Sequence, residues 1–268
     1  MSGVPISFHL GPLVFHTYGL GLAIAAYVCY LYARKRLASA GFDVALFGHF
    51  TFALIASGLI GARLANIATN WSYYSGHPQR WIAVWQGGLA SFGGIALALP
   101  IGLYLQRRWW PESSLTRFTD ALVPALLAGW ALGRVLGPQF MVNGGGHLTH
   151  QWFGISYHDQ FGKRIPVPLI QGLEDALLWL GLLGLERTWA RRATGIVTGV
   201  AMLVWGVVRS TDERLLLGQA SHSGSLGVQI AGLSLALAGV VLLVRQARAV
   251  RSTPDRLGDP SAQASPRT

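Results

Sequence analysis

The chain of 268 residues is 51% hydrophobic and only 12% charged, whereas a typical soluble domain carries about 25% charged residues. Together with a mean hydropathy of +0.41, this composition excludes an ordinary cytosolic enzyme, a disordered chain and a collagen-like repeat. The single cysteine, Cys29, excludes an internal disulfide and a zinc site built from several thiolates. The formal net charge of +10 would suggest nucleic-acid binding in a soluble protein. Here the basic residues lie between apolar runs, which is typical of loops that face an anionic membrane leaflet.

Seven apolar runs are candidates for membrane-spanning helices, since a bilayer core requires about 20 apolar residues per helix. They are Leu13–Leu31, Val44–Ile67, Leu89–Leu105, Phe118–Leu136, Leu169–Leu185, Gly195–Val208 and Leu226–Val244. The sixth run is short, so we expect it to be tilted, broken or extended into Arg209. The fourth contains Pro124, which a membrane helix tolerates where its neighbours satisfy the freed carbonyl. The pattern predicts an all-α integral membrane protein, a bundle of about seven transmembrane helices.

The basic residues alternate between the two sides of these runs. Arg34-Lys35-Arg36 follows the first run, and further arginines follow the third, fifth and seventh, whereas the alternate loops hold fewer. The positive-inside rule therefore predicts an N-terminus outside and a cytoplasmic C-terminus, which agrees with an odd number of spans. No Lys or Arg precedes Arg34, so the start lacks the basic region of a signal peptide. We expect the first span to remain in the mature protein.

The organisation expected from these runs is a single polytopic membrane domain over residues 1–251. The longest link, residues 137–168, lies on the outer side and contains Trp152-Phe153 and Ile165-Pro166-Val167-Pro168. Its aromatic residues favour an ordered arm at the membrane interface. The segment 252–268 has no apolar run, and we expect it to be a disordered cytoplasmic tail.

Three arginines lie within or at the ends of the apolar runs, near the outer side in this topology: Arg63, Arg134 and Arg209. Charged groups inside a span are costly and usually face the bundle interior. A guanidinium binds phosphate through two parallel hydrogen bonds and stays charged. Convergence of the three would form a pocket for a lipid phosphate. The alternative is that each reaches the interface or pairs with a carboxylate such as Asp212 or Glu213.

Seven short motifs occur in an order that resembles one known family. The first part of the chain holds three: Ile6-Ser7-Phe8-His9-Leu10-Gly11-Pro12 together with Tyr18-Gly19-Leu20, then Gly61-Ala62-Arg63-Leu64, and then Trp85-Gln86-Gly87-Gly88-Leu89-Ala90-Ser91-Phe92-Gly93-Gly94. The second part holds Asp120 with Gly133-Arg134, Arg164-Ile165-Pro166-Val167-Pro168-Leu169, Trp205-Gly206-Val207-Val208-Arg209 with Glu213, and Leu217-Gly218-Gln219-Ala220-Ser221. From about residue 6 to residue 244 the chain resembles the prolipoprotein diacylglyceryl transferases.

This resemblance implies a transfer reaction in the bacterial inner membrane, with no cofactor and no metal. In that family phosphatidylglycerol donates its diacylglyceryl group to the lipobox cysteine thiol of a lipoprotein precursor. A thioether forms and glycerol phosphate leaves. Arg134 and Arg209 match two family arginines that supply positive charge to the phosphate, and are implied to be catalytic and substrate-binding. The other residues implied to bind substrate are Arg63, Glu213, Tyr18, Asn143, Gln219, Gly87, Gly88, Gly93 and Gly94. The glycines would let the backbone approach a headgroup closely, or would pack helices together.

The chain departs from the family pattern at positions that handle protons. Phe92 stands where the family's Gly-rich motif commonly has a histidine, and Phe cannot move a proton. The family has a segment with two asparagines after the arginine that Arg134 matches. In this chain the segment is about three residues longer, so Asn143 matches the second asparagine only approximately. Ile170 and Gln171 occupy the family's Tyr-Glu positions. The histidines near the outer side leave the base open; they are His16, His147, His150 and His222.

Two other functions stay open at this point. A non-catalytic family relative that binds anionic phospholipid or a lipoprotein precursor would also keep the arginines and lose the proton-handling positions. A small membrane transporter would use discontinuous helices near the midplane; the outward arginines and the lack of an internal repeat argue against it. No nucleic-acid partner is expected.

Overall fold

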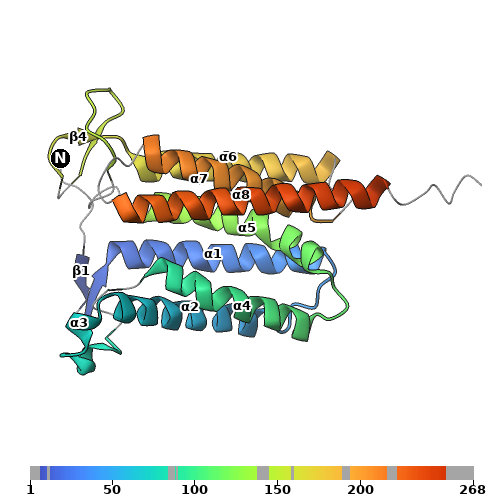
Figure 1. Cartoon of the computed structure of the whole chain (residues 1–268), viewed down its shortest axis with the longest axis horizontal. Helices are drawn as coiled ribbons and strands as arrows, with labels where there is room; N and C mark the ends of the chain where they lie inside the picture. Colours follow the sequence, from blue (N-terminus) through green and yellow to red (C-terminus); the bar gives the residue numbers. More distant parts are fainter. Residues whose placement is uncertain are drawn as a thin grey trace, which may run out of the picture. The chain divides into compact units, whose positions relative to one another are not determined.

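The computed structural model describes residues 7–10, 13–83, 88, 90–137, 145–157, 160–188, 194–215 and 222–251. Within these ranges the chain is almost entirely helical (Figure 1). The long helices have between 19 and 30 residues: α1 (Thr17–Ser39), α2 (Phe47–Thr69), α4 (Ser91–Trp109), α5 (Leu115–Leu136), α6 (Val167–Thr188), α7 (Ile196–Leu215) and α8 (His222–Arg251). Each of the seven expected spans therefore corresponds to a helix.

Four of these helices are long and apolar enough to cross a membrane, namely α2, α5, α6 and residues Leu226–Ala249 of α8. The remaining long helices carry more polar or basic residues, such as Arg34, Lys35 and Arg36 in the last turns of α1. The structure thus confirms a helical protein of membrane type. The full number of spans and their orientation stay predictions.

Short elements connect the long helices. Two-stranded antiparallel sheets form from β1 (Ser7–Leu10) with β2 (Leu13–His16) and from β3 (Ile155–Ser156) with β4 (Lys163–Arg164). The link after α2 holds α3 (Trp71–Tyr74) and the 3-10 helix η1 (Pro78–Arg80). The predicted start of the first span, Leu13, is wrong. Leu13–His16 forms strand β2, and the helix begins at Thr17. A run of apolar residues alone does not distinguish a strand from a helix.

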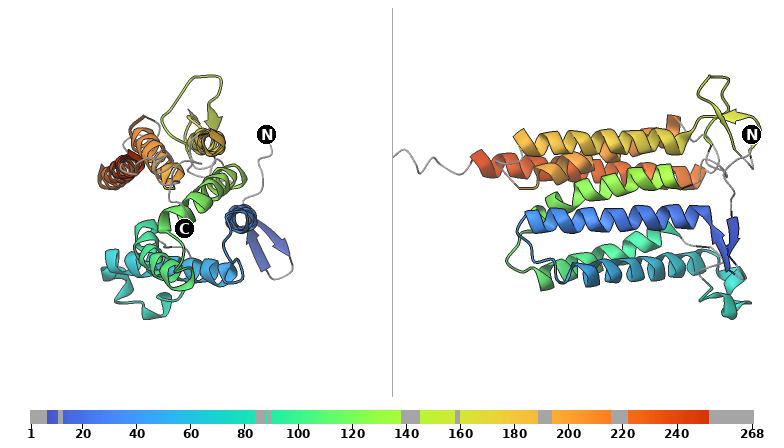
Figure 2. Two further views of the ribbon diagram at one scale, coloured as in Figure 1. Left: turned by 90° about the vertical axis from the view of Figure 1, so that its right-hand side faces the viewer. Right: turned by 180° about the vertical axis from the view of Figure 1, so that it is seen from behind.

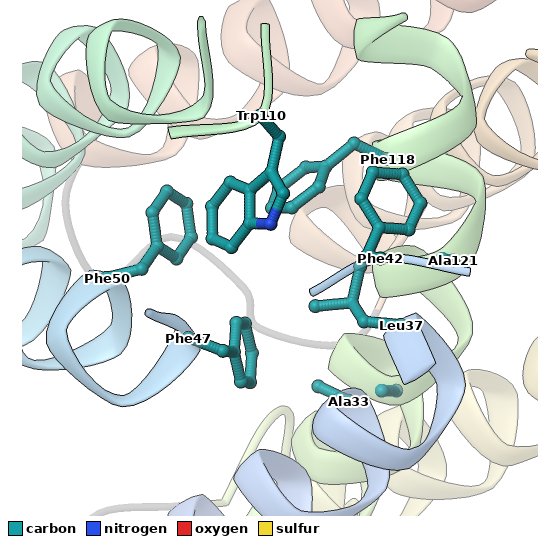
Figure 3. Packing of buried hydrophobic residues seen from close by; sticks show 9 residues of the cluster. Ala33, Leu37, Phe42, Phe47, Phe50, Trp110, Phe118 and Ala121 are labelled. Atoms are coloured by element: carbon teal, nitrogen blue, oxygen red, sulfur yellow. The ribbon is translucent and has the colours of Figure 1, made fainter. Parts of the chain in front are cut away.

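The chain forms two compact units, residues 1–22 with 130–268, and residues 23–129. In the second of these, here called the α2–α4 unit, α2 and α4 lie side by side (Figure 2). Its core joins helices α1, α2 and α5 with the link after α4 through an aromatic cluster (Figure 3). Phe50 is at its centre, with its ring 5.6 Å from that of Trp110 and 5.5 Å from that of Phe118, both edge to face.

The other compact unit, here called the α6–α8 unit, contains α6, α7, α8 and the end of α5. α7 and α8 pack along their length, and glycines on each helix permit the close approach: a Cβ at Gly232 would meet the Oγ of Ser210, and one at Gly239 would lie 2.7 Å from the carbonyl oxygen of Gly199. Such small-residue contacts are typical of helix pairs in membranes.

The described part of the arm between α5 and α6 contains the β3–β4 hairpin. Its β3–β4 hairpin is tied to the preceding segment by Gln160, whose side chain accepts a hydrogen bond from the Gly145 N–H and donates one to the Gly145 carbonyl. Arg164 donates a further hydrogen bond to the Gly146 carbonyl at 2.9 Å. These contacts support the expectation of an arm with its own structure. The expected tail, residues 252–268, lies outside the described residues.

Candidate functional site

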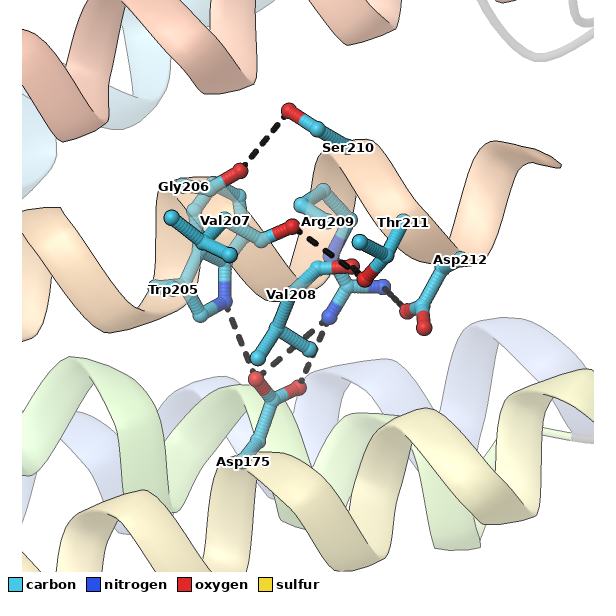
Figure 4. A network of polar contacts seen from close by, with 9 residues as sticks. All are labelled: Asp175, Trp205, Gly206, Val207, Val208, Arg209, Ser210, Thr211 and Asp212. Carbon is cyan, nitrogen blue, oxygen red and sulfur yellow. Dashed lines mark hydrogen bonds and ion pairs between the residues drawn. The ribbon is translucent and has the colours of Figure 1, made fainter. Parts of the chain in front are cut away.

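The centre of the candidate site is Arg209, a buried arginine on α7. Its Nη2 lies 3.4 Å from both carboxylate oxygens of Asp175 on α6, and its Nη1 lies 3.6 Å from Oδ2 of Asp212, three residues further along α7 (Figure 4). Trp205 donates a hydrogen bond of 2.9 Å from its indole Nε1 to the same Asp175 carboxylate. The guanidinium lies 5.0 Å from the centre of the Trp205 ring.

Helix geometry explains why these side chains meet. Residues three or four apart on a helix lie on the same face, so Trp205, Arg209 and Asp212 form one stripe along α7. α6 packs against α7 and presents Asp175, which is 1% exposed, to that stripe. A buried carboxylate requires a charged or hydrogen-bonding partner, and Arg209 and Trp205 provide both.

The guanidinium of Arg209 is not saturated by these contacts. Among the described residues, its Nε and Nη1 are buried and donate no hydrogen bond, and Oδ2 of Asp212 and Oε2 of Glu174 accept none. The distances of 3.4 and 3.6 Å are also longer than the 2.7–2.9 Å that is usual for a charge-assisted hydrogen bond. Because buried polar groups are nearly always hydrogen-bonded, the cluster retains capacity for further partners: acceptors for the two nitrogens of Arg209 and donors for the two carboxylate oxygens.

Arg134 on α5 joins the same cluster. Its guanidinium lies 5.9 Å from the centre of the Trp130 ring, and this ring contacts that of Trp205 edge to face at 6.3 Å. The charge of Arg134 also acts electrostatically on Asp175. α5 and α6 approach closely at this point, since a Cβ at Gly172 would lie 3.2 Å from Cβ of Arg134. The structure therefore brings Arg134 and Arg209 to two adjoining indoles, and the carboxylate of Asp175 pairs with Arg209.

Arg63 has a different environment, within the α2–α4 unit. It is buried and donates hydrogen bonds to three backbone carbonyls of the link after α2, those of Arg80, Trp81 and Gly88. Its guanidinium also lies 5.2 Å from the centre of the Tyr74 ring. These contacts hold the link, which is a structural use of the arginine. A role of Arg63 in binding substrate stays a prediction.

The glycines of the Gly-rich motif pack against protein groups wherever they are described. A Cβ at Gly93 would overlap Ala65 and the carbonyl oxygen of Gly61, and one at Gly94 would lie 2.9 Å from the carbonyl oxygen of Gly58. Gly88 has a φ of 72°, and a Cβ there would lie 3.0 Å from Nη1 of Arg63. The helix-packing alternative thus has direct support at Gly93 and Gly94, whereas contact of these glycines with a headgroup stays a prediction.

Several expected site residues have no described side chain. Asn143, Gln219 and Gly87 lie outside the described residues. Only the backbone is described for Tyr18 and for Phe92, the second residues of α1 and α4 respectively. Glu213 is half-buried on α7, next to Asp212. His147 and His150 are exposed on the arm. The roles expected for these residues therefore stay predictions.

The sequence reasoning did not identify Asp175, Trp205 or Trp130 as site residues. A signal for Asp175 was present, because Glu174-Asp175 is an ionisable pair inside an otherwise apolar run, and such residues usually face the interior and have partners. The two tryptophans gave no comparable signal, since Trp in a membrane protein is commonly an interface anchor.

Comparison with known proteins supports the family indicated by the motifs. A sequence model described as prolipoprotein diacylglyceryl transferase matches residues 5–245. The chain belongs to this family. Similar proteins include the phosphatidylglycerol–prolipoprotein diacylglyceryl transferases of Cutibacterium acnes, 30% identical over 90% of this chain and 85% of the relative, and of Symbiobacterium thermophilum, 26% identical over 95% and 97%. The protein of that name from Cupriavidus necator is 30% identical over 90% of this chain and 91% of the relative.

Proposed function

We propose that the protein is a phosphatidylglycerol–prolipoprotein diacylglyceryl transferase. The observation that carries the proposal is the arginine pair. Arg134 and Arg209 rest on adjoining indoles, and Arg209 keeps two buried nitrogens that donate no hydrogen bond within the described residues. Such donors suit the phosphodiester of a phospholipid. Membership of the family and the names of the similar proteins give the substrates.

The reaction joins sulfur to carbon and releases a phosphate. The thiolate of the precursor's lipobox cysteine attacks the glyceryl carbon that carries the phosphodiester. The bond between this carbon and the phosphate oxygen breaks, and glycerol phosphate leaves with the electron pair. Arg134 and Arg209 stabilise the negative charge on the departing phosphate. A fixed positive field in a water-poor site is worth more than the same charges in water. The thiol proton passes to a base, for which Phe92 is unsuitable.

The carboxylates of the cluster hold the arginines in place while the site is empty. The carboxylate of Asp175 accepts hydrogen bonds from both Trp205 and Arg209. It therefore fixes the direction of the two Arg209 nitrogens, Nε and Nη1, that donate no hydrogen bond to described residues. Because the ion pairs with Asp175 and Asp212 are long, a phosphate that offers shorter bidentate hydrogen bonds competes well for the guanidinium. The site is thus positioned before the lipid binds, which lowers the cost of binding.

The membrane arrangement that fits this chemistry has seven spans, with the N-terminus outside and residues 252–268 in the cytoplasm. α1, α4 and α7 join the four strongly apolar helices as spans, and residues 1–251 form one polytopic domain in the bacterial inner membrane. In this arrangement the C-terminal half of α7, with Arg209, lies toward the outer leaflet, where a secreted precursor is accessible. The arm, residues 137–168, lies on the same side, and the precursor's signal helix docks beside the bundle.

Transfer by the purified protein tests the proposal. The full chain is reconstituted in vesicles that contain phosphatidylglycerol and is incubated with a precursor peptide that carries a lipobox cysteine, and the peptide mass is followed by mass spectrometry. We expect addition of one diacylglyceryl group, with a rate about 100- to 1,000-fold lower for Arg134→Ala or Arg209→Ala, which is the usual effect of removing one donor that stabilises a developing anion. Arg245→Ala on α8, an exposed arginine, is the matched control.

Two outcomes would contradict the proposal. Transfer that is unaffected by both site substitutions would remove the arginine pair from the mechanism. A protein that binds phosphatidylglycerol in an Arg209-dependent manner but never modifies the peptide would be a non-catalytic relative that binds anionic lipid. The same peptide with serine in place of the lipobox cysteine should gain no mass, because the hydroxyl is a much weaker nucleophile than a thiolate.

A further inference from the structure

The α2–α4 unit contains a cavity that the transfer reaction does not explain. It has a volume of about 610 Å³ and is lined almost entirely by apolar side chains of four helices. The lining residues that matter for its position are Ala26 and Ala33 of α1, Phe47 and Ile55 of α2, Ile95 and Gln106 of α4, and Leu115 and Leu126 of α5. The space is partly open, and its volume lies within the range of about 300–1,000 Å³ that is usual for ligand pockets.

The cavity occupies the half of the unit that includes the basic ends of the helices. Ala33, which lines it, is followed directly by Arg34-Lys35-Arg36; Gln106, which lines it, is followed by Arg107-Arg108; and Arg117 lies between the lining residues Leu115 and Phe118. From the rise of 1.5 Å per residue, the lining segments extend about 10 to 17 Å along the helices, which is about half of a hydrocarbon core. The cavity thus has the depth of one membrane leaflet.

The basic residues at this end are available to a ligand. Arg34, Lys35, Arg107 and Arg108 are exposed, and within the described residues none of them forms an ion pair or a side-chain hydrogen bond. Arg36 and Arg117 instead bind backbone carbonyls, those of Ala121 and Ala40 respectively, and so tie the helix ends together. Six basic residues lie here against three carboxylates, those of Asp43, Glu112 and Asp120. The basic end of the unit, next to the cavity, is therefore complementary to an anion.

The wall of the cavity is open on an apolar side. Ile55 of α2 and Ile95 and Leu99 of α4 line the cavity and are each between 60% and 62% exposed. Toward the basic end the cavity is bounded by three side chains of the aromatic cluster, Phe47, Phe50 and Phe118 (Figure 3). A hydrocarbon chain can enter such a space sideways from a bilayer, whereas a polar solute would have to leave water for a wall that offers few hydrogen bonds.

We propose that this cavity holds an acyl chain of an anionic phospholipid whose headgroup lies against Arg34, Lys35, Arg107 and Arg108. In the proposed orientation these residues face the cytoplasm, so the lipid comes from the cytoplasmic leaflet. The site is separate in the chain from the arginine pair of the α6–α8 unit, and its occupant is not a reactant. It differs from general lipid contact in that side chains of four helices line the acyl chain and the headgroup is selected by charge.

Photocrosslinking from inside the cavity tests the proposal. The photoreactive residue p-benzoylphenylalanine replaces Leu122, a half-buried lining residue, in the full chain, and as a control replaces Ile60, an exposed apolar residue of α2 outside the cavity. Each protein is placed in nanodiscs of equal amounts of dioleoylphosphatidylserine and dioleoylphosphatidylcholine, and adducts are identified by mass spectrometry. We expect residue 122 to capture mainly phosphatidylserine and residue 60 to capture both lipids in proportion to their content.

The headgroup part of the proposal is tested by paired substitutions. Arg107→Gln with Arg108→Gln should lower the preference for phosphatidylserine at residue 122 by about fivefold for each charge removed, since a basic residue near an anionic surface contributes about that factor. Arg245→Gln with Arg248→Gln in α8 removes the same charge from the same expected side and should have no effect. Thr51→Trp, which fills the cavity from α2, should abolish both lipid adducts at residue 122 while the protein still elutes as one species in gel filtration.

Three results would overturn the proposal: an adduct at residue 122 that mirrors the lipid content of the nanodisc, an adduct with a peptide of this chain or of another copy, or a preference that Arg107→Gln with Arg108→Gln leaves unchanged. None of these readouts uses transferase activity. Failure of the lipid site and failure of the proposed reaction are therefore observed separately.

Discussion

At the scale of single residues, the balance of charge around Arg209 decides what the site can bind. The guanidinium has carboxylates at 3.4 and 3.6 Å and an indole at 5.0 Å, yet two of its nitrogens donate no hydrogen bond to described residues. A fully satisfied buried ion pair would be a structural device, whose net worth is often small. The long distances and unfilled donors instead suit an arginine that exchanges a weak internal partner for a strong external one.

Asp175 is expected to act as a positioning residue for Arg209. Asp175→Asn keeps an acceptor for the Trp205 indole and removes the negative charge that holds the guanidinium. We expect kcat of the transfer to fall about tenfold, the effect of about 1.4 kcal/mol, while KM for phosphatidylglycerol does not rise, because the competing carboxylate is also gone. Steady-state kinetics in vesicles measures both constants.

Further variants distinguish a positioning role of Asp175 from a loss of protein stability. Asp175→Glu restores the charge on a longer side chain and should recover part of the lost kcat, whereas Asp175→Ala leaves the Arg209 charge without its main partner and should also lower the melting temperature. If Asp175→Asn raised KM and left kcat unchanged, Asp175 would contact substrate or shape its pocket, and the positioning role would be wrong.

At the scale of the elements, the contact between α2 and α4 depends on glycine. Gly93→Ala places a methyl group against Ala65 and the Gly61 carbonyl, and we expect it to destabilise the protein by about 1–3 kcal/mol, as other overpacked contacts do. Gly181→Ala on α6 is the control, because a Cβ there has nothing within 4 Å and alanine favours a helix by about 0.5–1 kcal/mol. Thermal unfolding in detergent measures both; equal melting temperatures would contradict the packing role of Gly93.

The arm has a buried phenol with its own pH dependence. Tyr157 is 4% exposed, its hydroxyl has no hydrogen-bond partner among the described residues, and burial raises its pKa to about 12. An unfolded tyrosine ionises near pH 10. The folded arm therefore keeps this part of its stability below about pH 10 and loses it as the pH rises toward 12, because ionisation favours the unfolded form.

Tyr157→Phe removes the hydroxyl and with it this dependence. We expect the variant to be at least as stable as the native protein at about pH 8, because an unsatisfied buried hydroxyl costs about 1–3 kcal/mol. At about pH 11 it should be clearly more resistant to proteolysis within residues 145–166, since no phenolate can form there. Equal alkaline sensitivity of the two proteins would show that Tyr157 does not control the arm.

The elements also show how far the sequence predicts the structure. Apolar runs of about 20 residues predicted the long helices, because few other structures bury so many consecutive apolar residues. The β1–β2 hairpin was not predicted, since its strands, Ser7–Leu10 and Leu13–His16, read locally like the start of an apolar helix. In the site, the motifs identified Arg134 and Arg209 separately, whereas the pairing of Arg209 with Asp175 depends on the packing of α6 against α7, which periodicity does not specify.

The cavity of the α2–α4 unit could not be predicted for a similar reason. Its lining residues are ordinary apolar residues of four helices, and a sequence does not show whether such residues interdigitate or leave a space. The basic residues beside it were visible in the sequence, but there they served only to orient the chain. The proposed role of these basic residues in a lipid site depends on the structure, which places Arg34, Arg107 and Arg117 at one end of one helical unit.

At the scale of the whole molecule, the distribution of basic residues predicts the membrane topology, which can be tested by labelling. In a Cys29→Ser background, Lys163→Cys in the arm should react with a membrane-impermeant maleimide in intact cells, because we expect the arm to face outward. Arg248→Cys near the end of α8 should react only after the membrane is permeabilised. The reverse labelling pattern would invert the orientation and place the arginine pair on the wrong side for a secreted precursor.

The central claim is that this chain lipidates precursors through Arg134 and Arg209, and complementation tests it most directly. A bacterium is depleted of its own diacylglyceryl transferase, the chain is expressed, and the gel shift of a reporter lipoprotein is followed. We expect the native chain to restore the lipidated form, and Arg134→Ala and Arg209→Ala, at equal membrane levels, to leave the precursor unmodified. A native chain that inserts normally and restores nothing, for reporters with several different lipobox sequences, would contradict the account.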